Sequence, residues 1–484
     1  MDNPVAYNLI AGAQKEGAHR EAVDNPANVD EIVGYVEVAS TALVDAAVDS
    51  AHTAFPRWAA TPLSERKALL EQATQKVEKW QSEHDIPLLL TREQGKILAE
   101  ARRDAYGAIP VTRLNIDLAD AAITDRVTED EQGRNILVYD PIGVVAVVTP
   151  WNWPVLLTIN AVAPALLAGN SVVVKPAPNT PLVVTETLRT MASALPLGLL
   201  NVVQGGADVG GHLVSHPKVG KVTFVGSVAS GRKVYQSAGE STIKRLALEL
   251  GGNDPALIFG DTKLDDSVIR ALVDSTYMTT GQACIAIKRL YVHSDIIGEF
   301  TDKFLDAANE AVVGNGADET VTIGPLNNAM QYDKVRMMVR DADQAGATIR
   351  EVGRRAPGTR WDKGHFLLPS VALNAPEDSA LVTDEQFGPV VPILEFSDTD
   401  DVIARANDTH FGLSASIWSA DTERAFAVAR RLEAGKIWLN QHGLGGLDFG
   451  IAVGGVKNSG LGVHYGPEGI QAFTNRRLLT DRRL

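Results

Sequence analysis

The chain has 484 residues, more than one hydrophobic core normally serves, so two or three domains are expected. Hydrophobic residues make up 45% and charged residues 22% of it, the composition of an ordinary globular protein. With 45 Lys and Arg against 60 Asp and Glu, the formal net charge is −15. This charge disfavours nucleic acid and anionic membrane surfaces as partners, although a local basic pocket for an anionic cofactor is compatible with it.

Cys284 is the only cysteine, so no intramolecular disulfide can form, as is usual in a reducing cytoplasm. The chain does not open with a basic stretch followed by an apolar one, so no signal peptide is expected. Residues 141–174 carry no charge, but prolines and asparagines interrupt the run, which favours buried elements over a membrane span. We therefore expect a cytoplasmic protein without membrane partners.

Hydrophobic periodicity predicts helices early in the chain. One is expected to begin at Thr61-Pro62, with Thr61 as N-cap, and to run to about His84. A second is expected to open at Thr91. A strand, a helix and a strand without charged residues follow, over 142–148, 155–167 and 171–174. Such a unit is typical of a parallel crossover in a nucleotide-binding sheet.

The alternation of helices and strands continues towards the C-terminus. Further helices are expected over 182–195, 265–279, 297–313 and 400–406. Further strands are expected over 200–203, 222–225, 290–293, 390–395 and 414–418. A charged interlude at 124–140 is either a surface loop or a protruding hairpin. The predicted fold class is α/β with at least two doubly wound sheets.

Two residues suggest covalent catalysis. Cys284 follows a predicted helix, but a lone cysteine is as often a buried core residue as a nucleophile. Glu249 lies between two leucines and precedes two glycines, so we expect it to be buried. Burial would raise its pKa towards that of a general base, while the alternative is a structural ion pair.

Three further positions suggest a binding cleft. Asn152, between two tryptophans, is suited to donate to a developing oxyanion or to form a turn. Lys175 ends a buried strand, where nucleotide sites form in open sheets, although a solvated charge would also end a strand. Gly226-Ser227 opens a turn between a strand and a helix, as pyrophosphate sites do. Alone this spacing is weak evidence, and an ordinary turn is the alternative.

Seven motifs occur in a fixed order. They are Thr149-Pro150-Trp151-Asn152-Trp153-Pro154, Lys175-Pro176, Phe224-Val225-Gly226-Ser227, Glu249-Leu250-Gly251-Gly252, Gly281-Gln282-Ala283-Cys284, Glu385-Gln386-Phe387-Gly388-Pro389 and Gly454-Gly455-Val456-Lys457-Asn458-Ser459-Gly460. In this combination the sequence resembles the NAD(P)-dependent, hydrolytic aldehyde dehydrogenase superfamily along nearly its whole length.

The resemblance implies oxidation of an aldehyde to a carboxylic acid. Cys284 would form a thiohemiacetal, and Asn152 with the Cys284 backbone amide would hold the oxyanion. Glu249 would activate the water that hydrolyses the thioester. NAD is the expected cofactor, with NADP as the alternative. The residues expected at the cofactor are Trp151, Lys175, Gly205, Gly226, Ser227, Glu385 and Phe387.

The resemblance also implies three structural units. A Rossmann-like cofactor domain would comprise 1–122 and 140–251, and an α/β catalytic domain 252–452. A small β arm of 123–139 and 470–484 would join copies into a homodimer or homotetramer.

Three positions depart from the family pattern. Pro178 replaces a glutamate that binds the ribose hydroxyls, which removes a repulsion against NADP. Val453 replaces a phenylalanine of the aldehyde tunnel, which favours a bulky or aromatic aldehyde. His464 replaces a glutamate that relays protons from the general base; it is either a relay itself or a spacer.

Other functions fit less well. His212 and His216 have the spacing of a helical metal pair, but no third ligand is evident, so no metal is expected. His442 would complete a Cys–His hydrolase pair but would leave the dinucleotide motifs unused. A CoA-acylating semialdehyde dehydrogenase is disfavoured by Glu249, and a silent structural relative by the joint presence of the catalytic motifs.

Overall fold

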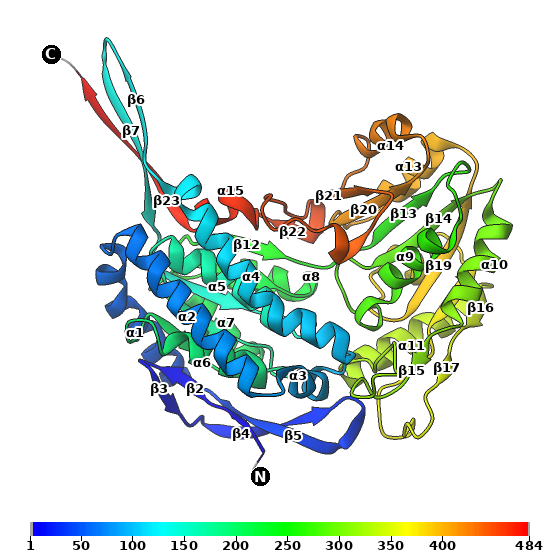
Figure 1. The fold of residues 1–484 in the computed structure, drawn as a ribbon, viewed down its shortest axis with the longest axis horizontal. Helices are drawn as coiled ribbons and strands as arrows, with labels where there is room; N and C mark the ends of the chain where they lie inside the picture. The colour runs from blue at the N-terminus through cyan, green and yellow to red at the C-terminus, as the bar shows by residue number, and fades with distance from the viewer. Residues whose placement is uncertain (1–2, 483–484) are drawn as a thin grey trace.

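The computed structural model describes residues 3–482, which contain two large sheets lying in two lobes (Figure 1). The first sheet has the strand order β22-β12-β11-β8-β9-β10-β2-β3. Its parallel strands are β8 (Val144–Val148), β9 (Ser171–Lys175), β10 (Leu200–Val202), β11 (Val219–Val225) and β12 (Arg245–Glu249). Its antiparallel strands are β2 (Asn8–Ile10), β3 (Ala13–Lys15) and β22 (Gly460–Leu461).

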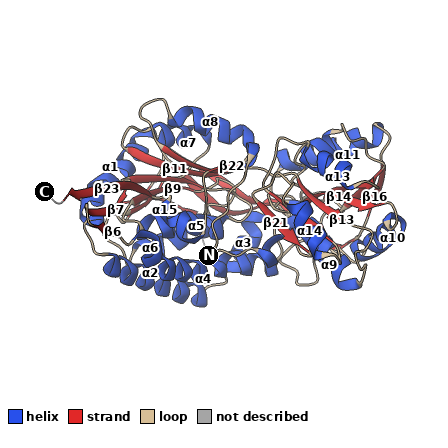
Figure 2. Ribbon diagram, turned by 90° about the horizontal axis from the view of Figure 1, so that it is seen from above, coloured by secondary structure: helices blue, strands red, loops and turns tan. Residues whose placement is uncertain are grey.

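Helices cover both faces of the first sheet (Figure 2). On one face lie α1 (Thr41–Ala59), α7 (Ala207–Ser215) and α8 (Val228–Ala238). On the other lie α2 (Leu63–Glu83), α3 (Ile86–Gln94), α4 (Leu98–Ile123), α5 (Pro154–Leu167), α6 (Leu182–Ala192) and α15 (Gly466–Gln471). Side chains of β8 alternate between the two cores: Val145 faces α5, whereas Val144 faces α1 and α7. This two-sided burial explains the uncharged run of the sequence.

The second sheet has the strand order β16-β18-β19-β14-β13-β20-β21. The strands are β13 (Asp254–Ile258), β14 (Ile287–His293), β16 (Thr348–Glu351), β18 (Ser370–Leu373), β19 (Val390–Phe396), β20 (Ser414–Trp418) and β21 (Lys436–Leu439), of which only β16 pairs antiparallel. The helices α9 (Asp266–Tyr277) and α10 (Ile297–Ala308) cover one face. The opposite face is covered by α11 (Ala329–Gln344), α12 (Ala380–Thr383), α13 (Thr399–Asn407) and α14 (Thr422–Ala429). Two doubly wound sheets are thus confirmed.

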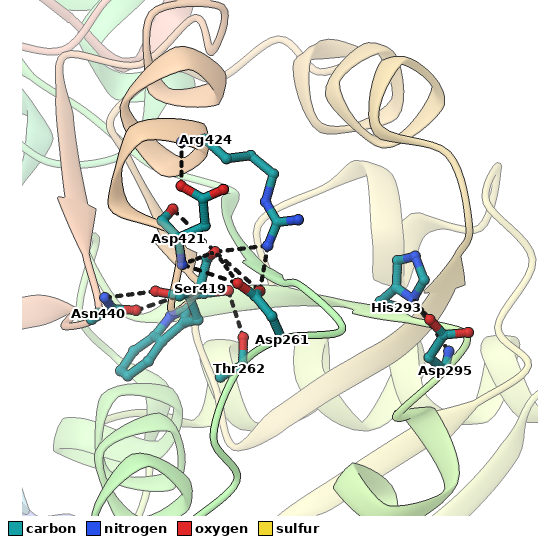
Figure 3. A network of polar contacts seen from close by, with 9 residues as sticks. Asp261, Thr262, His293, Asp295, Ser419, Asp421, Arg424 and Asn440 are labelled. Atoms are coloured by element: carbon teal, nitrogen blue, oxygen red, sulfur yellow. Dashed lines mark hydrogen bonds and ion pairs between the residues drawn. The ribbon is translucent and has the colours of Figure 1, made fainter.

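Polar contacts fix the carboxyl edge of the second sheet (Figure 3). Ser419 Oγ donates to Asp261 at 3.0 Å, and Asn440 Nδ2 donates to the Ser419 carbonyl at 3.0 Å. Arg424 forms an ion pair with Asp261. These contacts join the ends of β13, β20 and β21 away from Cys284, which precedes β14 at the amino edge.

Three smaller sheets complete the fold. The charged interlude forms the hairpin of β6 (Arg126–Asp130) and β7 (Gly133–Pro141), which pairs with β23 (Thr474–Arg482) and projects from the molecule (Figure 1). The other small sheets contain β1 (Val5–Ala6), β4 (His19–Asn25) and β5 (Asn28–Val38), and β15 (Val312–Val313) and β17 (Arg354–Arg355). The domain boundaries and the role of the projecting arm remain predictions.

Several predicted element boundaries are wrong. Thr61 Oγ1 donates to the Arg57 carbonyl at 2.9 Å, so Thr61 closes α1, and α2 begins only at Leu63. Thr91 lies inside α3, which ends at Gln94; the next residue, Gly95, has a φ of 101°, outside the helical region. The helix predicted over 297–313 ends at Ala308, because Val312 and Val313 pair with β17 instead. In residues 3–482, no helix combines the length and the apolar character that a membrane crossing requires.

Candidate active site

Two cavities meet at Cys284. The first lies at the carboxyl edge of the first sheet; its lining includes Trp151, Lys175, Pro178, Gly226, Ser227, Lys233, Glu385 and Phe387. The second is mostly apolar; its lining includes Trp153, Leu156, Leu157, Glu249, Ile285, Lys436, Trp438, Leu447, Phe449, Val453 and Tyr465. Asn152, Val225 and Cys284 line both cavities, so a ligand in either one reaches the thiol.

The loop that carries Cys284 is held from within the protein. A 3₁₀ turn, Met278–Gly281, precedes it, and the Lys288 ammonium donates to the carbonyls of Ala283 at 2.7 Å and Cys284 at 3.2 Å. Burial raises the pKa of Cys284 to about 12, and the Lys288 charge opposes that rise. The thiol is therefore protonated at neutral pH and would have to lose its proton before it could act as a nucleophile.

Asn152 connects the first sheet to this loop. Its Nδ2 donates to the Gln282 carbonyl at 3.0 Å, and its Oδ1 accepts from the Trp153 backbone N–H at 3.0 Å. A side-chain amide has two N–H hydrogens, so the second is available to a ligand oxygen in the shared part of the cavities. This side chain thus makes the local contact that a turn requires, and its role as an oxyanion donor stays a prediction.

Glu249 ends β12 and lines the same cavity as Cys284. Burial raises its pKa to about 8, while a hydrogen bond from the Gly455 backbone N–H opposes the rise. His464 Nε2 lies 3.3 Å from Glu249 Oε1. Burial lowers the pKa of His464 to about 4, so its imidazole is neutral near pH 7. Near pH 7 the Glu249 carboxyl group is therefore mostly protonated, and the His464 imidazole beside it is neutral.

The first cavity has the features of a dinucleotide site. Lys175 is 5% exposed, and its ammonium donates to the carbonyls of Pro176 at 2.8 Å and Gly205 at 3.1 Å; among residues 3–482 it has no recorded carboxylate partner. Burial lowers its pKa to about 8. Ser227 is the N-cap of α8, so the positive end of that helix faces the cavity. A Cβ on Gly226 would lie 2.6 Å from the Phe224 ring, which accounts for the glycine.

The other end of this cavity contains an aromatic pair and a carboxylate. The Trp151 and Phe387 rings meet edge to face with centroids 5.4 Å apart, and Phe387 has a φ of 53°. Glu385 Oε1 accepts from the Gly252 backbone N–H at 2.9 Å, and burial raises its pKa. The observed groups, a buried ammonium, a helix N-terminus, a carboxylate and aromatic rings, fit a nicotinamide dinucleotide.

Comparison with known proteins agrees with this geometry. The sequence profile described as the aldehyde dehydrogenase family matches residues 13–479. This chain belongs to the aldehyde dehydrogenase family. The succinate-semialdehyde dehydrogenase GabD of Escherichia coli, whose name specifies NADP(+), is 35% identical over 96% of this chain and 95% of its own. A glutarate-semialdehyde dehydrogenase of Pseudomonas aeruginosa is 36% identical over 94% of this chain and 93% of its own.

Solved structures agree as well. An NADP-dependent enzyme of Escherichia coli has a TM-score of 0.93 and 33% identity, covering 99% of this chain and 98% of that one. The betaine aldehyde dehydrogenase of Staphylococcus aureus in complex with NAD+ has a TM-score of 0.92 and 28% identity, covering 99% and 94%. The predicted enzyme class, a nicotinamide-dependent aldehyde dehydrogenase, is confirmed.

In this aldehyde dehydrogenase, the residues expected at the site line one of the two cavities, except Gly205, which accepts from Lys175, and His464, which lies beside Glu249; the structure adds other residues. Lys288 and Gln282 hold the loop that carries Cys284. Gln282 Nε2 donates to the Thr279 carbonyl at 3.0 Å, and Gln282 Oε1 accepts from the Asn327 backbone N–H at 2.9 Å. In the sequence, only the closeness of Gln282 and Lys288 to Cys284 pointed to these two residues. Lys436 begins β21, and only its place in the apolar cavity draws attention to it.

The competing histidine sites are not assembled as catalytic or metal centres. His442 Nε2 lies 2.8 Å from the Ile285 carbonyl, and burial lowers the pKa of His442 to about 3. His212 Nε2 lies 2.6 Å from Asp45, and His216 lies 3.7 Å from the same carboxylate. Over the described part of the chain, no group of three or more His, Cys, Asp or Glu side chains is placed to hold a metal ion.

Proposed function

We propose that this aldehyde dehydrogenase works through a covalent adduct on Cys284, which water activated by Glu249 then releases. One aldehyde, one oxidised cofactor and one water give one carboxylate, one reduced cofactor and two protons. The observation that carries the proposal is that Cys284, Asn152 and Glu249 line one cavity, at its junction with the dinucleotide cleft.

In the first half of the reaction, Cys284 Sγ bonds to the carbonyl carbon while its S–H proton passes to water. The developing oxyanion receives hydrogen bonds from Asn152 Nδ2 and the Cys284 backbone N–H. Glu385 and Phe387, which line the cleft beside Cys284, would hold the nicotinamide end of the cofactor, which would supply the hydride acceptor. The chain is left with a thioester on Cys284.

In the second half, Glu249 removes a proton from water as the oxygen attacks the thioester carbon. The C–S bond breaks, and the Cys284 thiolate leaves and regains a proton. With a pKa of about 4 against about 8 for Glu249, the His464 imidazole can hold the proton that Glu249 has collected only transiently, but its Nε2 lies 3.3 Å from Glu249 Oε1, close enough to pass that proton on. This favours a relay at His464 over a spacer.

NAD is the proposed cofactor, with NADP accepted at the same site. Lys175 would bind the adenine-side ribose, Glu385 the nicotinamide-side ribose and Ser227 the pyrophosphate, with Gly205 and Gly226 allowing close approach. Pro178 lines the cleft without a carboxylate, so the 2′-phosphate of NADP meets no repulsion there. Lys233, which lines the same cleft, adds a positive charge.

The substrate class follows from the second cavity. Trp153, Trp438, Phe449 and Tyr465 line it, and Phe449 and Tyr465 meet edge to face with centroids 5.1 Å apart. Val453 also lines it, as the departure from the family pattern implied. Aromatic rings favour stacking with another aromatic ring. We therefore propose an aromatic or similarly bulky apolar aldehyde.

One observation favours a second candidate. Lys436 lines this cavity, and its ammonium lies 5.9 Å from the Trp438 ring centroid. An ammonium there would bind the carboxylate of an ω-semialdehyde, the substrate class in the names of two relatives.

The experiment is to measure reduced-cofactor formation without CoA for aromatic, aliphatic and semialdehyde substrates, with wild type and Lys436→Met. The proposal expects the highest kcat/KM for an aromatic aldehyde and little effect of the substitution. A preference for a semialdehyde that disappears in Lys436→Met supports the second candidate. A requirement for CoA would refute the hydrolytic route.

We also propose that the projecting arm joins copies of the chain. Leu478 and Leu479 of β23 are 62% and 44% exposed, and Val127 of β6 is 49% exposed. Such an apolar surface on a narrow hairpin is typical of a buried interface. Sedimentation should show a homodimer or homotetramer, and Leu478→Asp with Leu479→Asp should shift it towards monomer.

A further inference from the structure

Three ionisable side chains lie behind the active site and take no direct part in the proposed chemistry. Lys96 and Asp104 are 1% and 0% exposed, and Glu100 is half-buried. Glu100 and Asp104 are four residues apart on α4, so they lie on the same face of that helix, and Lys96 immediately precedes the helix. Ionisable side chains are rarely buried to this extent unless they are paired with another group.

Asp104 holds the first turn of α5. The N-cap of α5 is Trp153, whose side chain accepts no capping hydrogen bond. Asp104 Oδ1 instead accepts from the Leu156 backbone N–H at 2.8 Å, so the cap comes from the neighbouring helix. Because Asn152 directly precedes this turn, its amide is positioned together with it.

Lys96 contacts both Asp104 and the wall of the second, mostly apolar cavity. Its ammonium lies 2.8 Å from Asp104 Oδ2, and both side chains are 0% exposed. The same ammonium lies 4.1 Å from the centroid of the Trp153 ring, which lines the cavity. The pair therefore restrains Asn152 through its C-terminal neighbour.

Glu100 reaches the other catalytic segment. Its Oε1 accepts from the Thr279 backbone N–H at 2.5 Å, at the start of the loop that carries Cys284. Thr279 and Thr280 have φ values of 50° and 60°, a region that β-branched residues rarely adopt. Such strained backbone persists only where surrounding contacts hold it. One face of α4 thus contacts both segments of the active site.

We propose that Lys96, Asp104 and Glu100 form a positioning frame that sets the distance between the Asn152 amide and the Cys284 thiol. The frame rests on the roles proposed above for Asn152 and Cys284. It acts during the attack step, when the oxyanion must lie within hydrogen-bond distance of Asn152 while Sγ bonds to carbon. A misplacement of about 1 Å at such a step costs roughly 100-fold in rate.

The test compares two double variants of the full chain, Lys96→Met/Asp104→Asn and Lys96→Met/Asp104→Leu. Both remove the buried charges, but only asparagine keeps an oxygen that accepts from Leu156 N–H. We expect the asparagine variant to keep most of the wild-type rate of the first hydride-transfer burst, because asparagine keeps the cap of α5 and methionine still packs on the Trp153 ring. The leucine variant should lose roughly 100-fold in that rate, with an unchanged KM for the cofactor.

A second pair and a surface control complete the test. Glu100→Gln, which keeps the acceptor oxygen, should retain a burst rate that Glu100→Met loses. Arg102→Met breaks an exposed ion pair of α4 with Glu319, 3.2 Å long, and should keep the wild-type rate.

Equal burst rates in the asparagine and leucine variants would overturn the frame. A leucine variant that also loses cofactor binding would overturn it too, because the effect would then be general unfolding. Cys284→Ala is measured alongside. If it remains active, the proposed covalent mechanism fails. If Cys284→Ala is inactive while the leucine variant keeps the burst rate of the asparagine variant, only the frame fails.

Discussion

Glu249→Gln separates the two halves of the proposed reaction. Glutamine has nearly the same size and keeps an oxygen that accepts from the Gly455 backbone N–H, so the fold around β12 should persist. It cannot remove a proton from water. General bases contribute about 10²- to 10⁴-fold, so steady-state turnover should fall by that factor. A first burst of reduced cofactor, close to one equivalent per site, should remain, because water and not Glu249 accepts the Cys284 proton during attack.

The pH dependence of the wild type follows from the same residue. Glu249 must be ionised to act as a base, and its pKa is about 8, so at pH 7 roughly one-tenth of it is ionised. Turnover limited by hydrolysis should therefore rise nearly tenfold per pH unit below pH 8 and level off above it. His464, with a pKa of about 4, changes its charge far below this range and does not account for the rise.

The assay is rapid-mixing absorbance of the reduced nicotinamide, which gives the burst and the steady state in one trace from pH 6 to 10. Glu249→Gln should lose the rise centred near pH 8. An unchanged steady-state rate in Glu249→Gln, or a wild-type profile that stays flat through pH 8, would refute the assignment of the base.

Three further changes test other parts of the site. Pro178→Glu should place a carboxylate beside the 2′-phosphate and lower kcat/KM for NADP relative to NAD by roughly tenfold or more. Steady-state kinetics with each cofactor measure this ratio, and an unchanged ratio would show that residue 178 does not contact the ribose. Lys288→Met leaves buried carbonyls in the loop that carries Cys284 without their hydrogen-bond donor. Urea unfolding should therefore show a free energy of unfolding lower by about 1–3 kcal/mol, and a wild-type value would contradict these contacts. His464→Phe should lower steady-state turnover several-fold and leave the burst unchanged; equal turnover would make His464 a spacer.

The candidate site was readable from the sequence because its chemistry lies in short segments. Cys284 follows a helix and Lys175 ends a strand that periodicity predicts, and glycines next to Glu249 and Cys284 and a proline after Lys175 mark turns. The order of the motifs then linked them. Buried parallel strands were equally clear, because burial on both faces leaves an uncharged run.

The parts that sequence reasoning missed depend on contacts between distant segments. Nothing near Asp104 indicates that it caps α5, 52 residues further along the chain. Thr91 looked like a helix start because threonine favours N-caps, but Ile86 and Pro87 already form a first turn under an Asp85 cap. Residues 124–140 fitted a loop or a hairpin equally well, since pairing with β23 depends on strands more than 300 residues apart.

The most direct test of the covalent mechanism is the mass of Glu249→Gln after mixing with aldehyde and oxidised cofactor. Because Cys284 is the only cysteine, a thioester can be assigned to one peptide. We expect an added acyl group on the peptide that contains Cys284, absent when the cofactor is omitted. Reduced cofactor formed without any acyl group on that peptide, or with the group on another residue, would contradict it.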